Sequence, residues 1–227
     1  MGVKILTDTT DIPITMIGEM SGICYGADTK NHDKNYQRGL NCIKSNHGRT
    51  LEFPQIYMEI SGYSARVIRE LYTHISGAPT RLQASTRYIK YHNFDYIVPP
   101  SIKSNDEAKL MYDSLMGMIA DTKAILERDY NIPKEDSAMI LPLGMESTIV
   151  YRTNLRGLID MAAQRKCTRA YWEFRNLFKD IEESLAFYSD EWNYLVNDLK
   201  IFQCKCDKLG YCPEEKGCGR YPKRGEN

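Results

Sequence analysis

Residues 69–88 read RELYTHISGAPTRLQASTRY, and the second half of this stretch decides how the chain is interpreted. Arg81 to Tyr88 concentrates guanidinium, hydroxyl and amide groups and offers little hydrophobic surface. Arginine side chains suit phosphate and carboxylate groups, and neighbouring hydroxyls can complete an anion site. In an extended conformation, Gln83, Ser85 and Arg87 point to one face. The segment therefore predicts either an anion site or a solvated loop with ion pairs.

Hydrophobic spacing in the rest of the chain predicts a mixture of helices and strands. The predicted strands are residues 3–6, 52–60 and 147–152, and the predicted helices are residues 16–20, 64–74, 105–129 and 154–187. Two further features are a polar stretch at 28–49, read as a loop or exposed helix, and a break in the last helix near Thr168. Prolines at 99 and 100 are expected to stop regular structure. The pattern lacks the regular βαβ alternation of a doubly wound sheet, so we expect an α+β fold.

Composition narrows the class of protein. The chain has 227 residues with 42% hydrophobic content, which suits one large domain or a domain with an appendage. Thirty basic residues balance thirty acidic ones, so bulk charge favours neither nucleic acid nor a membrane surface as partner. No apolar run approaches the roughly 20 residues of a membrane span, and the start does not resemble a signal peptide. We expect a cytoplasmic enzyme or binding protein.

Common catalytic motifs are missing from the sequence. There is neither a GxGxxG nor a GxxxxGK[ST] phosphate loop, and neither a GxSxG elbow nor an HExxH pair. His74 and Ser85 lack an assignable third group, which disfavours a hydrolytic triad. Cys24, Cys42 and Cys167 lack the setting of a reactive nucleophile. The chemistry is therefore expected to come from a cofactor.

The predicted helix from residue 154 carries polar residues at helical spacing. Asn154 and Arg165 are eleven residues apart, about three turns, so they lie near one face. Arg156 and Asp160 are four residues apart and also share a face. The two interpretations are a surface helix with an ion pair and a polar stripe that lines a ligand site.

A series of motifs follows along the chain, made up of His47, Glu52, residues 69–88, Leu141-Pro142 and NLRGLIDMAAQRKCTRAYWEFR at 154–175. In this order, the motifs resemble those of the flavin-dependent thymidylate synthases. The resemblance covers roughly residues 15–190. The family signature ends in S-x-R-Y, which stands here as residues 85–88. Asn154 lies twelve positions after Pro142, and the downstream motif follows in register.

The resemblance implies a fold and a reaction. The fold is an antiparallel sheet flanked by helices, assembled as a homotetramer with active sites between subunits. The reaction uses FAD reduced by NADPH, and a one-carbon unit from methylenetetrahydrofolate converts dUMP to dTMP. The reduced flavin mediates the transfer, so the protein orients and polarises the pyrimidine without a nucleophile of its own.

The same resemblance assigns roles to residues of this chain. Arg165 is the catalytic residue, contacting the pyrimidine and favouring its ionised form. The residues expected to bind nucleotide are Glu70, Gln83, Ala84, Ser85, Thr86, Arg87 and Arg165, with Arg87 as the phosphate partner. The residues expected to bind the flavin are His47, Thr73, His74, Ile75, Gln83, Asn154, Arg156 and Asp160.

The chain departs from the signature at several positions. The R-H-R triplet reads Thr73-His74-Ile75, two extra residues precede Ser85, and the N-E pair reads Leu82-Gln83. Ala138 stands where many members place a phosphate-binding arginine, a charge that Arg81, Arg69 or Arg152 can supply. An amide both donates and accepts, so Gln83 raises methylation of another pyrimidine nucleotide such as dCMP as an alternative. A non-catalytic flavin- or nucleotide-binding homologue is the other alternative.

The cysteines divide the chain into a predicted enzyme domain at 1–200 and a cysteine-rich tail at 201–227. Cys204, Cys206, Cys212 and Cys218 lie among glycines and a proline. An odd total of seven cysteines and the lack of a signal peptide argue against disulfides. Four thiolates predict a structural zinc site, in which Cys167 can replace one ligand. The alternative is a set of reduced cysteines on a flexible tail.

Overall fold

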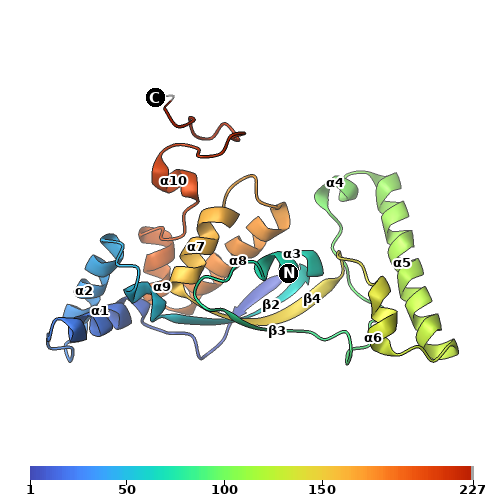
Figure 1. Ribbon diagram of the computed structural model, residues 1–227, viewed down its shortest axis with the longest axis horizontal. Helices are drawn as coiled ribbons and strands as arrows, with labels where there is room; N and C mark the ends of the chain where they lie inside the picture. Colours follow the sequence, from blue (N-terminus) through green and yellow to red (C-terminus); the bar gives the residue numbers. More distant parts are fainter. Residues whose placement is uncertain (226–227) are drawn as a thin grey trace. The chain divides into compact units, whose positions relative to one another are not determined.

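The computed structural model describes residues 1–225 and shows a mixed fold built on one sheet (Figure 1). The strands are β1 (Gly2–Ile5), β2 (Gln55–Ser64), β3 (Thr80–Gln83) and β4 (Glu146–Asn154), in the order β1-β2-β4-β3. Beyond β1, the Leu6 amide donates to the Tyr57 carbonyl, and the Thr10 amide donates to the Gln55 carbonyl. This pairing has an antiparallel register. The expected α+β fold with an antiparallel sheet is confirmed.

Ten α-helices are assigned within the described residues. They are α1 (Pro13–Cys24), α2 (His32–Lys44), α3 (Ala65–Leu71), α4 (Pro100–Lys103), α5 (Asp106–Asp129), α6 (Lys134–Ser137), α7 (Leu155–Arg165), α8 (Trp172–Tyr188), α9 (Asp190–Asn193) and α10 (Lys205–Leu209). Short 3-10 turns cover Thr50–Glu52 and Ala138–Ile140, and a π-helical turn covers Tyr194–Asp198.

The chain forms two compact units. The first comprises residues 1–2, 60–73 and 82–150, and the second comprises residues 3–59, 74–81 and 151 onward. Strands β2 and β4 contribute residues to both units. The division into 1–200 and 201–227 stays a prediction, and residues 226–227 of that tail lie outside the described residues.

The second unit has its core between α7 and α8, which contact each other (Figure 1). Leu155, Leu158 and Met161 on α7 face this core, as do Phe174, Leu177, Phe178 and Ile181 on α8, and all are at most 1% exposed. The apolar residues recur every three or four positions, which is the spacing that buries one face of a helix. The predicted break near Thr168 is confirmed, because residues 166–171 separate the two helices.

The start of α1 depends on a carboxylate from far along the chain. Ile12 at the N-cap has no side-chain oxygen, and instead Glu191 in α9 accepts hydrogen bonds from the amides of Ile14 (2.6 Å) and Thr15 (3.0 Å). A carboxylate satisfies exposed amides and complements the helix dipole. The helix therefore begins at Pro13, three residues before the start predicted from the sequence.

The first unit is organised around α5. Met116 on α5 packs with Phe94 and Met145 in a small core surrounded by tyrosines. Two turns further on, the side chain of Lys123 is fully buried and pairs with Glu127. Glu127 also accepts from the Ser137 hydroxyl (2.6 Å) and lies 2.9 Å from His92 Nε2. A buried cation persists only when it is paired and hydrogen-bonded, so this network fixes α6 and the His92 segment against α5.

Two local predictions were wrong. The prolines at 99 and 100 begin α4 instead of ending structure, because proline suits the first helical turn. Residues 81–88 are extended only as far as Gln83, after which the amides of Tyr88 and Ile89 turn back to the Ser85 carbonyl. Ser85 and Arg87 therefore do not continue the strand face of Gln83.

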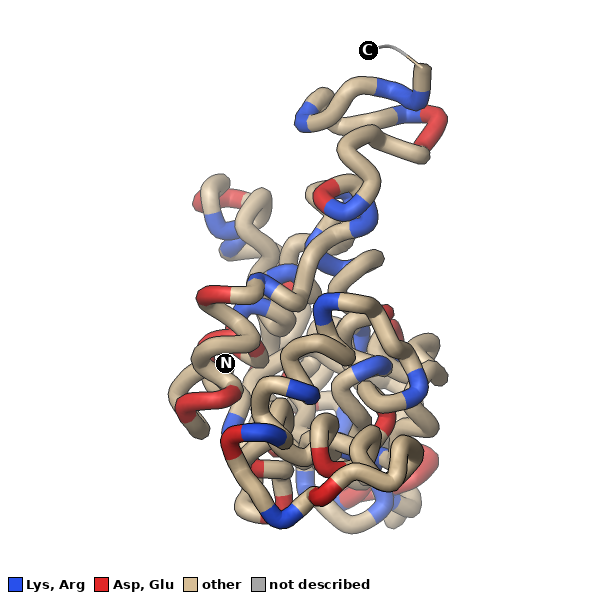
Figure 2. The backbone as a smooth tube through the Cα atoms, turned by 90° about the vertical axis from the view of Figure 1, so that its left-hand side faces the viewer, with Lys and Arg blue, Asp and Glu red and all other residues tan. Residues whose placement is uncertain are grey.

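Charged residues of both signs are distributed along the whole chain. Figure 2 shows Lys and Arg positions interspersed with Asp and Glu positions, in keeping with thirty residues of each sign. Among residues 1–225, none of the helices is both long enough and apolar enough to cross a bilayer.

The buried Lys123–Glu127 pair predicts acid sensitivity. Burial raises the pKa of Glu127, but hydrogen bonds from Lys123, Ser137 and His92 outweigh it and hold the pKa at about 2, below the ordinary 4.5. A depressed carboxyl pKa contributes stability above pH 4.5, and that stability is lost as the pH falls toward 2. We expect Glu127→Gln to lower the free energy of unfolding by about 3 kcal/mol at neutral pH, because it leaves Lys123 buried without its charge partner.

Urea denaturation at pH 7 and at several acidic pH values measures both effects. Glu183→Gln is the matched control, since Lys179 and Glu183 form a pair with the same helical spacing whose side chains are both more than half exposed. That change is expected to cost less than about 0.5 kcal/mol. Equal losses for the two variants would contradict the account.

Candidate active site

Arg165, the last residue of α7, is held by an aromatic ring and a histidine. Its Nε–H donates to Nε2 of His74 over 2.8 Å, and its guanidinium lies 4.5 Å from the centre of the Phe174 ring. The His74 ring is 5.7 Å from the same phenyl ring. A guanidinium above an aromatic face is attracted by the ring's negative charge density. Three segments of the second unit thus meet at one cation.

The protonation states at this centre are fixed by burial. His74 is 8% exposed, and desolvation, followed by repulsion from Arg165, lowers its pKa to about 4. The imidazole is therefore neutral at neutral pH. Because Nε2 accepts the Arg165 hydrogen bond, the ring proton lies on Nδ1. Neutral His74 accepts the hydrogen bond that orients Arg165, and it adds no second positive charge beside the guanidinium.

The loop that carries His74 lies on the first turn of α7. Asn154 caps this helix, its Oδ1 accepting from the Gly157 amide at 2.9 Å. Gly77 has φ +79°, and a Cβ there would lie 2.5 Å from Asn154 Oδ1. Only glycine permits both this backbone conformation and this approach. Ser76 adds a hydrogen bond from its hydroxyl to Asp160.

Arg156 connects the same helix turn to the His47 segment. Its Nη1 donates to Glu52 at 2.6 Å, and Gly48 lies against its guanidinium. His47 is exposed, and its carbonyl accepts from the Thr50 hydroxyl at 2.8 Å. An Arg156–Asp160 ion pair, one of the two interpretations of this helix, is replaced by these separate contacts. The structure thus gathers the His47 segment, Asn154, Arg156 and Asp160 around the first half of α7, whereas His74 lies at the helix end beside Arg165.

Gln83 in the first unit joins two elements through its amide. Its Oε1 accepts from the Tyr72 hydroxyl at 3.1 Å, and its Nε2 donates to Ser147 Oγ at 3.0 Å. A carboxylate can only accept, so with glutamate at this position the Ser147 hydroxyl would have to donate instead. The departure from the signature glutamate therefore has a local structural role.

The predicted phosphate residues lie in the turn after β3. Ser85 Oγ accepts from the Arg87 amide at 3.2 Å, and Arg87 Nε donates to Glu135 at 2.8 Å. Both partners of that ion pair are more than half exposed. Ala84 remains tied to the sheet through the Thr148 carbonyl (2.8 Å), with Thr86 beyond it in the turn.

The other predicted contacts are dispersed. Glu70 pairs with Arg66 at 3.7 Å, the Thr73 hydroxyl donates to the Glu70 carbonyl at 2.7 Å, and Ile75 is exposed. Arg152 donates to Gln55 at 2.9 Å and to Thr80, so it links strands and is a poor replacement for the missing arginine. Arg69 is exposed on α3.

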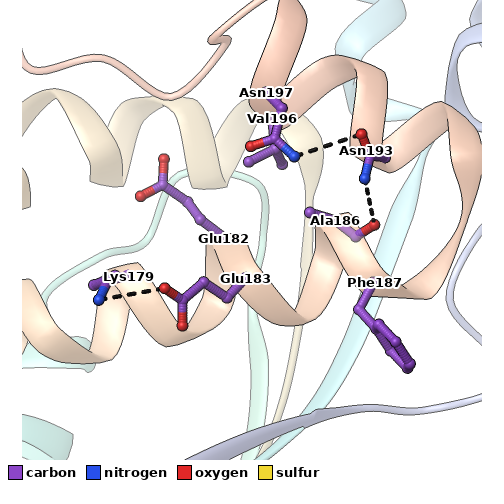
Figure 3. A pocket seen from close by; sticks show the side chains of 8 residues that line it. All are labelled: Lys179, Glu182, Glu183, Ala186, Phe187, Asn193, Val196 and Asn197. Carbon is purple, nitrogen blue, oxygen red and sulfur yellow. Dashed lines mark hydrogen bonds and ion pairs between the residues drawn. The ribbon is translucent and has the colours of Figure 1, made fainter.

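Two hollows in the second unit differ in whether Arg165 forms part of their wall. One of about 500 Å³ includes Arg165 in its wall, together with Gln164 and the tail residues Lys205 and Glu214. Another of about 500 Å³ lies along α8 and α9 (Figure 3), where Lys179 pairs with Glu183 and Phe187 points outward, 94% exposed. The predicted site residues do not line this second hollow, so the one beside Arg165 is the better candidate for a substrate site.

Phe174 was missed by the sequence reasoning. It stands in the quoted motif, but an aromatic residue at helical spacing indicates a core position and gives no hint of a cation above it. The cysteines were predicted to bind metal. In the described part of the chain, no group of three or more His, Cys, Asp or Glu side chains is already arranged as a metal site.

Comparison with known proteins identifies the family. The family described as "Thymidylate synthase complementing protein" matches residues 5–186. A flavin-dependent thymidylate synthase of Nitratidesulfovibrio vulgaris is 32% identical over 191 residues, covering 80% of this chain and 75% of that protein. One from Clostridium tetani is 27% identical, covering 97% of this chain and 94% of its own length. The chain belongs to the flavin-dependent thymidylate synthase family.

Solved structures agree on the fold. A crystal structure of the flavin-dependent thymidylate synthase of Helicobacter pylori, complexed with FAD and dUMP, has a TM-score of 0.68 and 20% sequence identity. The match covers 87% of this chain and 99% of that one. At this identity the likeness supports the fold alone.

The contact between Gly77 and Asn154 predicts a steep cost for a single methyl group. We expect Gly77→Ala to lower the free energy of unfolding by more than about 2 kcal/mol, since it combines the cost of a left-handed conformation with a clash at the helix cap. Gly26→Ala is the control, because Gly26 has φ +63° and open space around it. It should cost only about 1 kcal/mol. Urea denaturation of both variants measures the difference, and similar losses would refute the packing argument.

Proposed function

We propose that this protein is a flavin-dependent thymidylate synthase that methylates dUMP to dTMP. Family membership supports the class of reaction, and the curated relatives carry this enzyme name. The observation that carries the proposal is Arg165, a cation held by His74 and Phe174 in the wall of a hollow. A preorganised cation stabilises negative charge that develops on a pyrimidine ring without reorganising during the reaction.

The first turns of α7 fit an FAD cofactor. Arg156 and Asp160 are exposed, and His47 is exposed beside them, so charged and hydrogen-bonding groups face outward from a rigid helix. The close approach of Gly77 to Asn154 holds the adjoining loop in place. These residues, with His74 and Ile75, would hold the flavin, whereas the flavin roles of Thr73 and Gln83 stay predictions from the resemblance.

The protein's own part in the reaction is binding and polarisation. Bound FAD supplies the redox chemistry, with NADPH as reductant and methylenetetrahydrofolate as one-carbon donor. Arg165 contacts the pyrimidine and favours its ionised form, because an arginine stays protonated throughout. Neutral His74 keeps that guanidinium in place. A cytoplasmic location stays a prediction from the sequence.

Arg87 is the proposed partner of the nucleotide phosphate, beside Ser85. In the structure, Arg87 is paired with Glu135 at the surface. Such exposed pairs contribute at most about 1 kcal/mol, so a phosphate dianion can displace the carboxylate at small cost. Glu70, Ala84 and Thr86 keep their proposed nucleotide roles on the resemblance alone.

Methylation of dCMP is the alternative raised by Gln83. Both ends of its amide are engaged by Tyr72 and Ser147, so the amide has partners within the protein without a different pyrimidine. NADPH oxidation by the FAD-loaded protein, measured with dUMP, with dCMP and without nucleotide, separates the possibilities. Stimulation by dUMP supports the proposal, stimulation by dCMP alone supports the alternative, and no turnover with any nucleotide indicates a non-catalytic homologue.

A second copy of the chain is the proposed partner of α5. Met111, Leu115, Met118 and Ile125 form a stripe at helical spacing that is 41–77% exposed, on a different side of the helix from the Met116 core. A four-turn apolar stripe on a soluble surface is typical of a helix–helix interface. It supports the homotetramer that the family resemblance implies.

Arg165→Lys tests the role of the guanidinium. Lysine keeps the positive charge but lacks the planar fork that donates to His74, so we expect kcat/KM for dUMP to fall about 100-fold. Arg175→Lys is the control, because Arg175 on α8 is partly exposed and its side chain donates to the Thr168 carbonyl. Steady-state kinetics with matched FAD content measures both, and full activity in Arg165→Lys would contradict the assignment.

Met118→Lys tests the assembly. A lysine in the centre of the stripe should shift the mass measured by light scattering from tetramer toward smaller species. Gly117→Lys adds the same charge at an open, exposed neighbouring position and should leave the mass unchanged. An unchanged tetramer in Met118→Lys would show that the interface lies elsewhere.

A further inference from the structure

Five of the seven cysteines line one small hollow. Cys167, between α7 and α8, meets Cys204, Cys206, Cys212 and Cys218 of the tail there. Cys204, Cys206 and Cys212 are 2–7% exposed and form the buried centre of the tail, with Tyr221 packed against them. The interior of this segment is therefore mostly sulfur, whereas a hydrophobic core would be built from aliphatic side chains.

The sulfurs lie within reach of one another. The Cys206 side chain is hydrogen-bonded to that of Cys212, and Cys204 and Cys167 line the same hollow. The backbone holds these positions: Cys204 caps α10 and accepts from the Asp207 amide, and the Cys212 amide donates to the Pro222 carbonyl at 2.7 Å. A segment this short rarely stays folded without a covalent or metal cross-link.

We propose that Cys167, Cys204, Cys206 and Cys212 bind one zinc ion. Four thiolates are a ligand set that favours Zn²⁺, and four protein ligands leave no open position, so the role is structural. Binding releases the thiol protons to solvent, and the side chains must rotate from mutual hydrogen bonding to reach one centre, since no group in residues 1–225 is already placed for a metal. Cys218 is exposed and hydrogen-bonded to Thr168 and to the Arg220 amide, which leaves Cys167 as the fourth ligand.

The zinc site would fix the surroundings of Arg165. Cys167 follows Arg165 by two residues, and the hollow beside Arg165 is partly walled by Lys205 and Glu214 of the tail. Arg169 pairs with Glu214 at 2.7 Å, and Lys166 donates to the Phe202 carbonyl at 2.8 Å, so the tail already contacts the α7–α8 link. The metal would lock this wall in place. The metal site itself does not depend on the proposed reaction.

Metal analysis of the full chain, reconstituted with zinc under reducing conditions and dialysed, tests the proposal. We expect about one zinc per chain, and about none in Cys206→Ser, Cys212→Ser or Cys167→Ser. Cys24→Ser removes an exposed cysteine outside the cluster and should keep the metal, as should Cys218→Ser. Cobalt in place of zinc should give the strong visible absorption of a tetrahedral thiolate site in the wild type and in both control variants.

Three results would overturn the proposal. Less than about half an equivalent of zinc in the wild type would exclude a stable site. A Cys206–Cys212 disulfide in protein isolated without oxidant would make the cluster a redox pair. Loss of zinc in Cys218→Ser with retention in Cys167→Ser would place the metal wholly within the tail and remove its link to Arg165.

Discussion

The hydrogen bond from Arg165 Nε–H to a neutral, buried His74 is the interaction on which the rest of the site depends. It needs three segments at once: the loop at 74–78, the end of α7 and the start of α8, which supplies Phe174. Each contributes what the others lack, namely an acceptor, a cation and an aromatic surface. Because burial disfavours a charged imidazole, His74 adds no second positive charge to that of Arg165.

The opposite end of α7 is fixed with similar precision. Asn154 caps the helix, and Gly77 packs on that cap, so the loop that presents His74 to Arg165 also rests on the first turn. The helix is thereby held at both ends by one short loop. This arrangement explains how a proposed flavin site at one end and a proposed pyrimidine contact at the other can keep a constant separation.

The sequence predicted the parts of the fold that local pattern controls. The helices at 105–129 and 154–187, the break near Thr168 and the three strands follow from hydrophobic spacing and turn residues. It did not predict that Glu191 caps α1 or that Phe174 supports Arg165, since those contacts join residues far apart in the chain. The exchange of glutamate for Gln83 suggested a different substrate until its contacts with Tyr72 and Ser147 gave it a structural reason.

The family motif located Arg165, but only the structure revealed what holds it. The central claim is that this held cation serves the methylation of dUMP. Release of tritium from dUMP labelled at C5 measures that reaction most directly, because the C5 hydrogen must leave when the new carbon is attached. With FAD, NADPH and methylenetetrahydrofolate present, the account predicts steady release that disappears when the folate is omitted. No release from flavin-loaded protein in the complete mixture would contradict it.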